Sequence, residues 1–272
     1  MSSRPRPRSS FPLGALALVA ALLLALPLVS LLLRAPWASF AHLLRGTTVV
    51  SALALSLGTA TAATLVALVL GVPLAWWLAA PHSRAWASIA GIVRALVTLP
   101  LVLPPVVGGV ALLMAFGRMG VLGRPLGALG LSLPFTTAAV VLSQVFVAMP
   151  FLVVGVEGAL AQRDVELEEA AETMGASAWQ VFRHVTLPLA APAVAAGTVL
   201  CWARALGEFG ATITFAGNVP GRTQTTPLAV YLAMQDDPDA AVALSVVLLA
   251  VCTLVLVVLR GRWLGQLARL RG

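Results

Sequence analysis

Long runs of apolar residues are the feature of this sequence that most restricts its fold. A helix needs about 20 mostly apolar residues to cross the hydrocarbon core of a bilayer. Because lipid offers no hydrogen-bond partner to backbone groups, such runs must be helical. The sequence therefore predicts an all-α, polytopic membrane protein with about six transmembrane helices, forming a single transmembrane domain over residues 1–272. The predicted spans are 11–33, 46–80, 95–117, 134–160, 190–216 and 240–259.

The first two runs each allow two interpretations. The basic segment RPRPR at residues 4–8, followed by an apolar stretch, is similar to a signal peptide. The apolar stretch 11–33 is longer than the 7–15 residues typical of a signal-peptide core, so we favour a retained first span. The run 46–80 exceeds one crossing, so part of it should lie along the membrane surface or extend beyond the core.

Charge is scarce in this sequence. Hydrophobic residues make up 60% and charged residues 10%, with a mean hydropathy of +0.99, whereas about 25% of residues are charged in ordinary soluble domains. All 17 basic residues are arginine, which excludes a lysine-dependent Walker A loop and Schiff-base chemistry on this chain. Cys201 and Cys252 lie in apolar runs, and the three histidines are scattered. We therefore expect no catalytic site, no metal site and no cofactor on this chain.

The arginines lie mainly in the short segments between apolar runs, which indicates membrane orientation rather than nucleic-acid binding. With both termini placed in the cytoplasm, the outer segments carry only Arg34, Arg45, Arg118, Arg124 and Arg222. Arg204 lies within a span, and the other eleven fall on the cytoplasmic side. This positive-inside bias predicts cytoplasmic N- and C-termini and a cytoplasmic loop over residues 161–189.

That loop contains five of the ten acidic residues, between Asp164 and Glu172. Asp164 is placed to cap the start of a helix, and acids in the first turns suit the positive end of its dipole. An apolar stripe at helical spacing follows, formed by Leu167, Ala170 or Ala171, and Met174.

A turn and a second short helix are predicted to follow. Gly175 fits a left-handed position after a helix end. Ser177 and Gln180 have the spacing of a capping box, and Pro188 is expected to start the return into the membrane. The pattern predicts helix, glycine turn, helix. By periodicity alone, a solvated amphipathic linker fits as well.

The spacing within the loop adds a specific resemblance. Glu169-Ala170-Ala171, three residues, Gly175, nine residues and Val185-Thr186-Leu187-Pro188 resemble the EAA loop of ABC importer permeases, with Val185 replacing the usual isoleucine. The resemblance implies a type I ABC importer permease fold, in which this loop is a coupling helix that docks on a separate ATP-binding subunit. The residues it assigns to coupling are Glu168, Glu169, Ala170, Ala171, Gly175, Leu187 and Pro188.

Two segments within the spans contain groups that are unusual in lipid. Residues 99–109, LPLVLPPVVGG, have three prolines, which predict either a kinked packing helix or a helix break that lines a pathway. In the fifth span, Arg204 and Glu208 are one helical turn apart and can pair. They form either a buried structural pair or part of a pathway or gate. The candidate pathway residues are Arg204, Glu208, Thr212, Thr214 and Asn218.

The fifth span, its continuation to Tyr231 and the segment 99–109 resemble molybdate permease subunits, and the similarity runs over about 48–259. Sulfate and thiosulfate permeases share much of this pattern. The resemblance implies a homodimer in the bacterial inner membrane, with one pathway at the two-fold axis. It also implies two ATP-binding subunits that bind ATP and Mg, and an extracytoplasmic oxyanion-binding protein.

Several alternatives remain at this level. Sulfate, thiosulfate or tungstate could replace molybdate as the substrate. A membrane-embedded enzyme or scaffold would be expected to carry a cluster of catalytic His, Asp or Cys residues, which this sequence lacks. A secondary transporter would usually carry acids within several spans for ion coupling, and here Glu208 is nearly alone.

Overall fold

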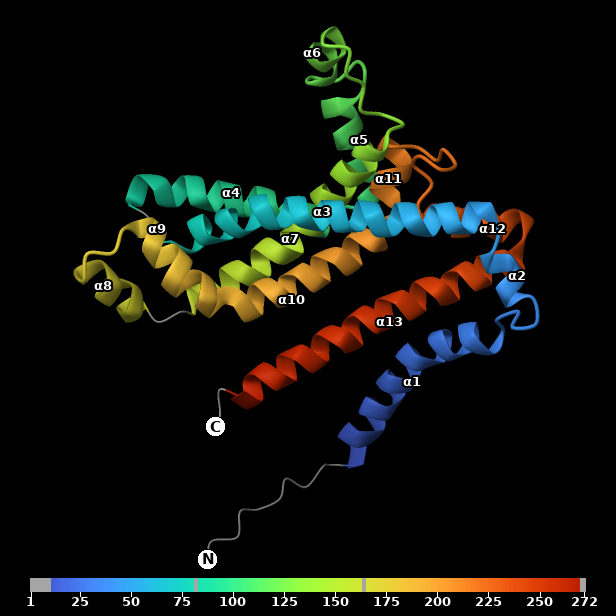
Figure 1. Ribbon diagram of the computed structural model, residues 1–272, viewed down its shortest axis with the longest axis horizontal. Helices are drawn as coiled ribbons and strands as arrows, with labels where there is room; N and C mark the ends of the chain where they lie inside the picture. Colours follow the sequence, from blue (N-terminus) through green and yellow to red (C-terminus); the bar gives the residue numbers. More distant parts are fainter. Residues whose placement is uncertain (1–10, 81–82, 163–164, 270–272) are drawn as a thin grey trace, which may run out of the picture.

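The computed structural model describes residues 11–80, 83–162 and 165–269. Within these residues every regular element is a helix (Figure 1). The first half of the chain has α1 (Phe11–Leu33), α2 (Phe40–Leu44), α3 (Thr47–Ala79), α4 (Arg84–Val102), α5 (Pro105–Phe116) and α6 (Gly123–Ala128). The second half has α7 (Thr137–Ala161), α8 (Val165–Thr173), α9 (Ala178–Val181), the π-helical turn η1 (Phe182–Thr186), α10 (Leu187–Leu206), α11 (Gly210–Phe215), α12 (Thr226–Asp236) and α13 (Pro238–Arg269).

Among the described residues, five helical stretches are long and apolar enough to cross a membrane. They lie in α1, α3, α7, the continuous stretch from α9 to α10, and α13. Helix α1 has the predicted bounds 11–33, and α7 differs from the predicted 134–160 by a few residues. Helix α3 is one unbroken helix, so no part of the long run 46–80 folds into a separate surface helix.

The predicted span 95–117 is not one helix, and of the two alternatives for the proline segment 99–109 the structure has the helix break. Helix α4 ends at Val102, and a new helix, α5, begins at Pro105. Pro104 and Pro105 lack backbone N–H groups, and a proline disfavours helical backbone in the residue before it, so the helix cannot continue through this point. Figure 1 shows α5 leaving the bundle at a steep angle to α4.

The predicted span 190–216 is also divided into two helices, which the sequence did not predict. Helix α10 ends at Leu206, and the short α11 begins at Gly210. Gly207 follows the last helical residue of α10, and the carboxylate of Glu208 accepts a hydrogen bond from the backbone N–H of Ala211. That bond satisfies a free donor at the start of α11, which stabilises the interruption.

Helices α3, α7 and α10 form the core. Their contact surfaces consist largely of small residues, which let helix backbones approach closely where lipid provides no hydrophobic driving force. A Cβ atom added to Gly197 of α10 would lie 2.9 Å from the Leu152 side chain of α7. The small buried residues of this core include Ala60, Ala63, Ala67, Ala75, Ala148, Ala190, Cys201 and Ala205. Helix α1 lies outside the core, beside α13, and exposes most of its apolar surface (Figure 1).

Candidate functional site

The loop predicted to couple with a partner folds into a sharp turn after α8. Gly175 has a φ of +89°, in the left-handed region that favours glycine, which confirms the prediction for this position. The N–H of Gly175 donates to the Glu172 carbonyl at 2.9 Å, and the N–H of Ala176 donates to the Ala171 carbonyl at 3.1 Å. These two bonds form a Schellman motif, so the turn is a fixed helix end.

The second arm of the loop begins with the predicted capping box. The Ser177 side chain accepts from the Gln180 N–H at 3.4 Å, and the Gln180 side chain accepts from the Ser177 N–H at 2.8 Å. The arm is not a separate short helix, however. It runs from α9 through η1 into α10, because Pro188 lacks an N–H and its ring crowds the carbonyl four residues earlier, which favours a wider π turn.

A hydrogen bond between Thr186 and Glu168 joins the two arms. The buried Thr186 donates from Oγ1 to Glu168 Oε1 at 2.7 Å. Ala171 is buried against the loop, while Glu169 and Ala170 are exposed. We call the segment from Val165 to Thr186 the elbow. The predicted cap Asp164 lies outside the described residues.

The elbow exposes apolar side chains next to its acids. Met174 is 82% exposed and Trp179 is 65% exposed. A shallow hollow of about 340 Å³ lies between the arms, lined by residues that include Ala171, Gly175 and His184. Exposed apolar groups around a hollow are typical of a surface that binds another protein.

The second predicted site lies where α10 gives way to α11. Arg204 Nη1 is 2.6 Å from Glu208 Oε2, so the predicted pair is present. The Glu208 side chain is 1% exposed and that of Arg204 is 27% exposed. The other carboxylate oxygen of Glu208 accepts from the Ala211 N–H at 2.8 Å. One buried carboxylate therefore pairs with a cation and also caps α11.

The three polar residues predicted downstream have different surroundings. Thr212 is fully buried, and its hydroxyl has no hydrogen-bond partner among the described residues. Thr214 donates to the Gly210 carbonyl of its own helix at 2.8 Å. Asn218 follows the end of α11, after Gly217 with its φ of +73°. Thr212 is therefore the one of these three residues that has an unused hydroxyl donor and also lies closest in sequence to the Arg204–Glu208 pair.

The two interrupted helices meet each other. A Cβ atom on Gly109 of α5 would lie 2.6 Å from the Thr214 Cβ and 3.0 Å from the Ala211 backbone. A Cβ atom on Gly210 would lie 2.8 Å from the Pro105 side chain. Figure 1 shows α5 and α11 side by side. The proline segment 99–109 and the Arg204–Glu208 segment thus belong to one structural region.

Sequence reasoning missed two features of α7. Arg94 of α4 donates from Nε to Glu157 Oε1 at 2.6 Å, and it also donates to the Leu78 carbonyl of α3 at 3.1 Å. Gln144 is fully buried, and neither atom of its amide has a partner among the described residues. The sequence signal for the buried amide was the presence of a glutamine, Gln144, within an apolar run.

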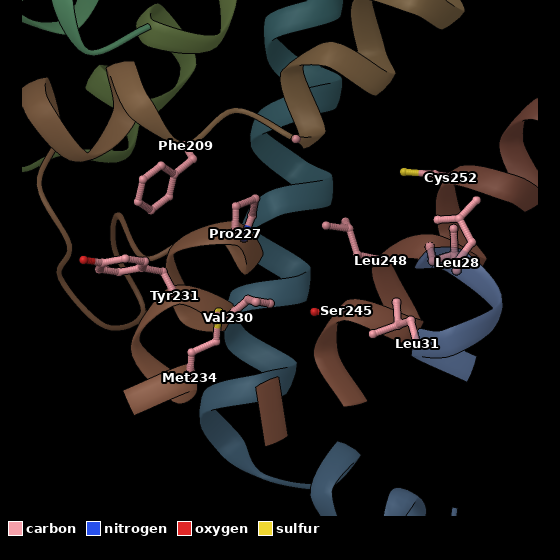
Figure 2. Close-up of a pocket in the computed structure, with 12 residues that line it drawn as sticks. Leu28, Leu31, Phe209, Pro227, Val230, Tyr231, Met234, Ser245, Leu248 and Cys252 are labelled. Atoms are coloured by element: carbon pink, nitrogen blue, oxygen red, sulfur yellow. The ribbon is translucent and has the colours of Figure 1, made fainter. Parts of the chain in front are cut away.

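A pocket borders the helix interruption on the side of α12 and α13. It has a volume of about 530 Å³ and is lined almost entirely by apolar side chains. Figure 2 shows Phe209 facing Tyr231 of α12, and the two ring centroids are 5.2 Å apart. The lining offers no cation to an anionic ligand, so this pocket does not suit an oxyanion.

Comparison with known protein families identifies the chain's relatives. Residues 71–269 match the family described as "Binding-protein-dependent transport system inner membrane component". The chain belongs to this family. It is accordingly an inner-membrane permease with several membrane-spanning helices.

Several curated permeases are similar over most of their length. The "Molybdenum transport system permease protein ModB" of Mycobacterium tuberculosis is 49% identical over 88% of this chain and 89% of its own. The protein of the same name from Haemophilus influenzae is 44% identical over 80% and 93% of the two chains. The "Sulfate transport system permease protein CysT" of Escherichia coli is 35% identical over 94% and 92%.

Solved permeases share the fold of this one. A bacterial ABC transporter that imports the polysaccharide alginate superposes with a TM-score of 0.73, over 92% of this chain and 93% of that chain, at 18% identity. The MetNI methionine ABC transporter superposes with a TM-score of 0.63, over 79% and 94%, at 22% identity. The predicted fold class, an all-α ABC importer permease, is confirmed.

Proposed function

We propose that this permease is the transmembrane subunit of an ATP-driven importer for a tetrahedral oxyanion, and that the oxyanion is molybdate. The observation that carries the proposal is the similarity to ModB permeases, at 38–49% identity over most of the chain in the relatives from four species. The elbow and the paired helix interruptions supply the two parts that such a subunit needs.

The elbow is the part that we assign to energy coupling. It docks on a separate ATP-binding subunit, which binds ATP and Mg, so this chain needs neither a cofactor nor a catalytic site. The fixed turn at Gly175 and the exposed Met174 and Trp179 support docking, because a rigid surface transmits displacement without deforming. The residues assigned to coupling are Glu168, Glu169, Ala170, Ala171, Gly175, Leu187 and Pro188.

The region around α5 and α11 is the part that we assign to translocation. Two copies of the chain form a homodimer with the pathway at the two-fold axis, lined by Arg204, Glu208, Thr212, Thr214 and Asn218. Non-helical backbone within the membrane is tolerated where it lines a cavity or is buried in protein, and here two interruptions lie together. A pathway of hydroxyls and one paired cation binds an oxyanion weakly, which allows release.

Two further assignments complete the proposal. An extracytoplasmic binding protein delivers the oxyanion, and both termini and the elbow are cytoplasmic. The arginine distribution supports this orientation. One solved transporter of the same fold is described in complex with a periplasmic protein loaded with alginate oligosaccharide, which supports delivery from that side.

Sulfate is the second candidate substrate, because the CysT sulfate permease matches an even larger share of this chain. The test is uptake into vesicles that contain the permease, its ATP-binding subunit and its binding protein. We expect accumulation of radiolabelled molybdate that requires ATP hydrolysis and is reduced by excess tungstate, which has the same shape and charge. Accumulation of sulfate with no accumulation of molybdate would contradict the proposed substrate.

A further inference from the structure

Gln144 of α7 has a buried side-chain amide that forms no hydrogen bond with the described residues. Its side chain is 0% exposed, and neither Nε2 nor Oε1 has a hydrogen-bond partner among the described residues. Buried polar groups are nearly always hydrogen-bonded, because an unpaired amide loses its water without compensation. The adjacent Ser143 follows that rule, since it is equally buried and donates to the Ala139 carbonyl at 2.9 Å.

The packing of α7 places Gln144 opposite the interruption between α10 and α11. On one side of it, Val140 packs in a cluster with Phe215 and Ala216, which lie at the end of α11. On the other side, Val145 and Ala148 belong to the cluster that contains Ala205, at the end of α10. These two neighbourhoods place the turn of α7 that carries Gln144 at the level of the interruption between α10 and α11, which both pack on α7.

The segment of the chain at the level of Gln144 contains two polar residues, Thr212 and Glu208, that affect whether an anion can bind there. Thr212 is one turn before Ala216, so it lies at the level of Gln144, and its buried hydroxyl also has no partner among the described residues. Glu208 would repel an anion, but its two oxygens are engaged by Arg204 and by the Ala211 N–H. Two unused neutral donors therefore lie in the same part of the fold as a carboxylate whose charge is already compensated.

We propose that Gln144 contacts the oxyanion during translocation, donating from Nε2 while Thr212 donates from its hydroxyl. The inference rests on the proposed function and adds to it a residue on α7. Neutral donors suit this task, because hydrogen bonds to a charged oxygen are strong, yet without a full opposite charge the anion is not trapped. A passing oxyanion would supply the partner that Nε2 and the Thr212 hydroxyl lack among the described residues.

The experiment uses the complete complex, reconstituted with its ATP-binding subunit and binding protein, and radiolabelled molybdate as the probe. Gln144→Leu removes the donor with little change in volume. We expect molybdate uptake to fall by about tenfold or more, which is the loss of one hydrogen bond to a charged group. ATP hydrolysis stimulated by the binding protein should persist, and the Tm should stay equal or rise, because an unpaired polar group has been removed.

Two further variants sharpen the result. Gln144→Glu keeps the shape but adds a negative charge, so uptake should fall further than with leucine. Ser143→Ala is the matched control, because this buried neighbour bonds only within its own helix, and its uptake should stay near the wild-type value.

Three outcomes would overturn the inference. Normal uptake by Gln144→Leu would show that the amide does not contact the substrate. A joint fall of uptake, ATP hydrolysis and Tm in that variant would show a structural role. A wild-type complex that accumulates no molybdate would overturn the proposed function and this inference together, whereas wild-type uptake that survives in Gln144→Leu overturns this inference alone.

Discussion

The elbow and the region of the two helix interruptions are built by different means. In the elbow, the turn and caps join residues within five positions of one another, such as Ala171 with Ala176 and Ser177 with Gln180. In the other region, Gly109 of α5 packs against Thr214 of α11, about a hundred residues away in the chain. The contrast indicates that the shape of the elbow depends on local bonds, whereas the shape of the interruptions depends on the packing of α5 against α11.

The largest expected effect concerns the side of the membrane on which the elbow lies, because a cysteine placed on it is either labelled from outside or not labelled at all. Met174→Cys, in a background without Cys201 and Cys252, places an exposed thiol on the elbow. A membrane-impermeant maleimide should label it in inside-out vesicles and leave it unlabelled in intact cells. Ready labelling in intact cells would place the elbow on the outer side and reverse the proposed topology.

Loss of the buried ion pair should have the next largest effect. Arg204→Ala leaves the Glu208 carboxylate buried without its cation, which costs about 3–5 kcal/mol of folding stability. Thermal unfolding of the purified permease measures it. Glu208→Gln keeps the shape and should change molybdate uptake more than stability.

Arg94→Ala is the matched control for that pair. The Arg94–Glu157 distance is also 2.6 Å, but the Arg94 side chain is 48% exposed, so solvent screens the charges and the loss should be clearly smaller. If both arginine variants lose equal stability, burial does not distinguish the two pairs. If Arg204→Ala and Glu208→Gln both transport normally, the pathway assignment is wrong.

The contact between α5 and α11 should tolerate no added atom. Gly109→Ala places a methyl group within 3.0 Å of the Ala211 backbone and should cost about 1–3 kcal/mol, with reduced uptake, because the interruptions are forced apart. Gly91→Ala in α4 is the control, since a Cβ atom there meets nothing within 4 Å and alanine favours a helix. Equal Tm values for the two variants would refute the close contact.

The turn of the elbow should respond to backbone conformation alone. A Cβ atom on Gly175 would meet nothing within 4 Å, so Gly175→Val acts only through its positive φ, at about 1–3 kcal/mol. We expect lost uptake and lost binding of the ATP-binding subunit in pull-down assays, with normal membrane insertion. Gly175→Asn should retain more activity, because asparagine tolerates this conformation. Gly158→Val, on an open face of α7, is the control.

The smallest expected effect concerns the bond between the arms. Thr186→Val removes the hydrogen bond to Glu168 at nearly constant shape and should lower stability by about 0.5–1.5 kcal/mol, with a modest loss of coupled ATP hydrolysis. Thr173→Val is the control, because the exposed Thr173 bonds only to the Glu169 carbonyl of its own helix. A larger loss in the control would show that the bond between the arms is unimportant.

The same contrast explains what the sequence could predict. Gly175 and the Ser177–Gln180 box follow local rules of helix ends, so their conformations were predictable from neighbouring residues alone. The interruption at Pro104 had a local signal as well, because the prolines of residues 99–109 predicted a helix break as one of two alternatives. The family resemblance, which rests on spacing in the elbow, was therefore the most secure inference.

The interruption after Leu206 had no comparable local signal. It depends on the Glu208 carboxylate capping Ala211 and on the close approach of α5, which no pattern within the fifth span reveals. The Arg94–Glu157 pair joins residues 63 positions apart, and Gln144 became notable only when the packing showed its amide to be unpartnered. Such features arise from tertiary packing, so they emerge only from the assembled structure.

The π-helical turn between α9 and α10 has a mechanical consequence. Residues Ala178–Leu206 form one continuous helical stretch of 29 residues, about 43 Å along its path at 1.5 Å per residue, which changes direction between α9 and α10 (Figure 1). The start of this stretch is the second arm of the elbow, and its end, Leu206, directly precedes the interruption between α10 and α11. A tilt of about 5° of α10, which is about 30 Å long by its 20 residues, would displace its far end by about 2.6 Å, close to the 2.6 Å length of the Arg204–Glu208 ion pair. The π-helical turn thus connects the second arm of the elbow to the helix interruption through continuous helical backbone, with no loop between them.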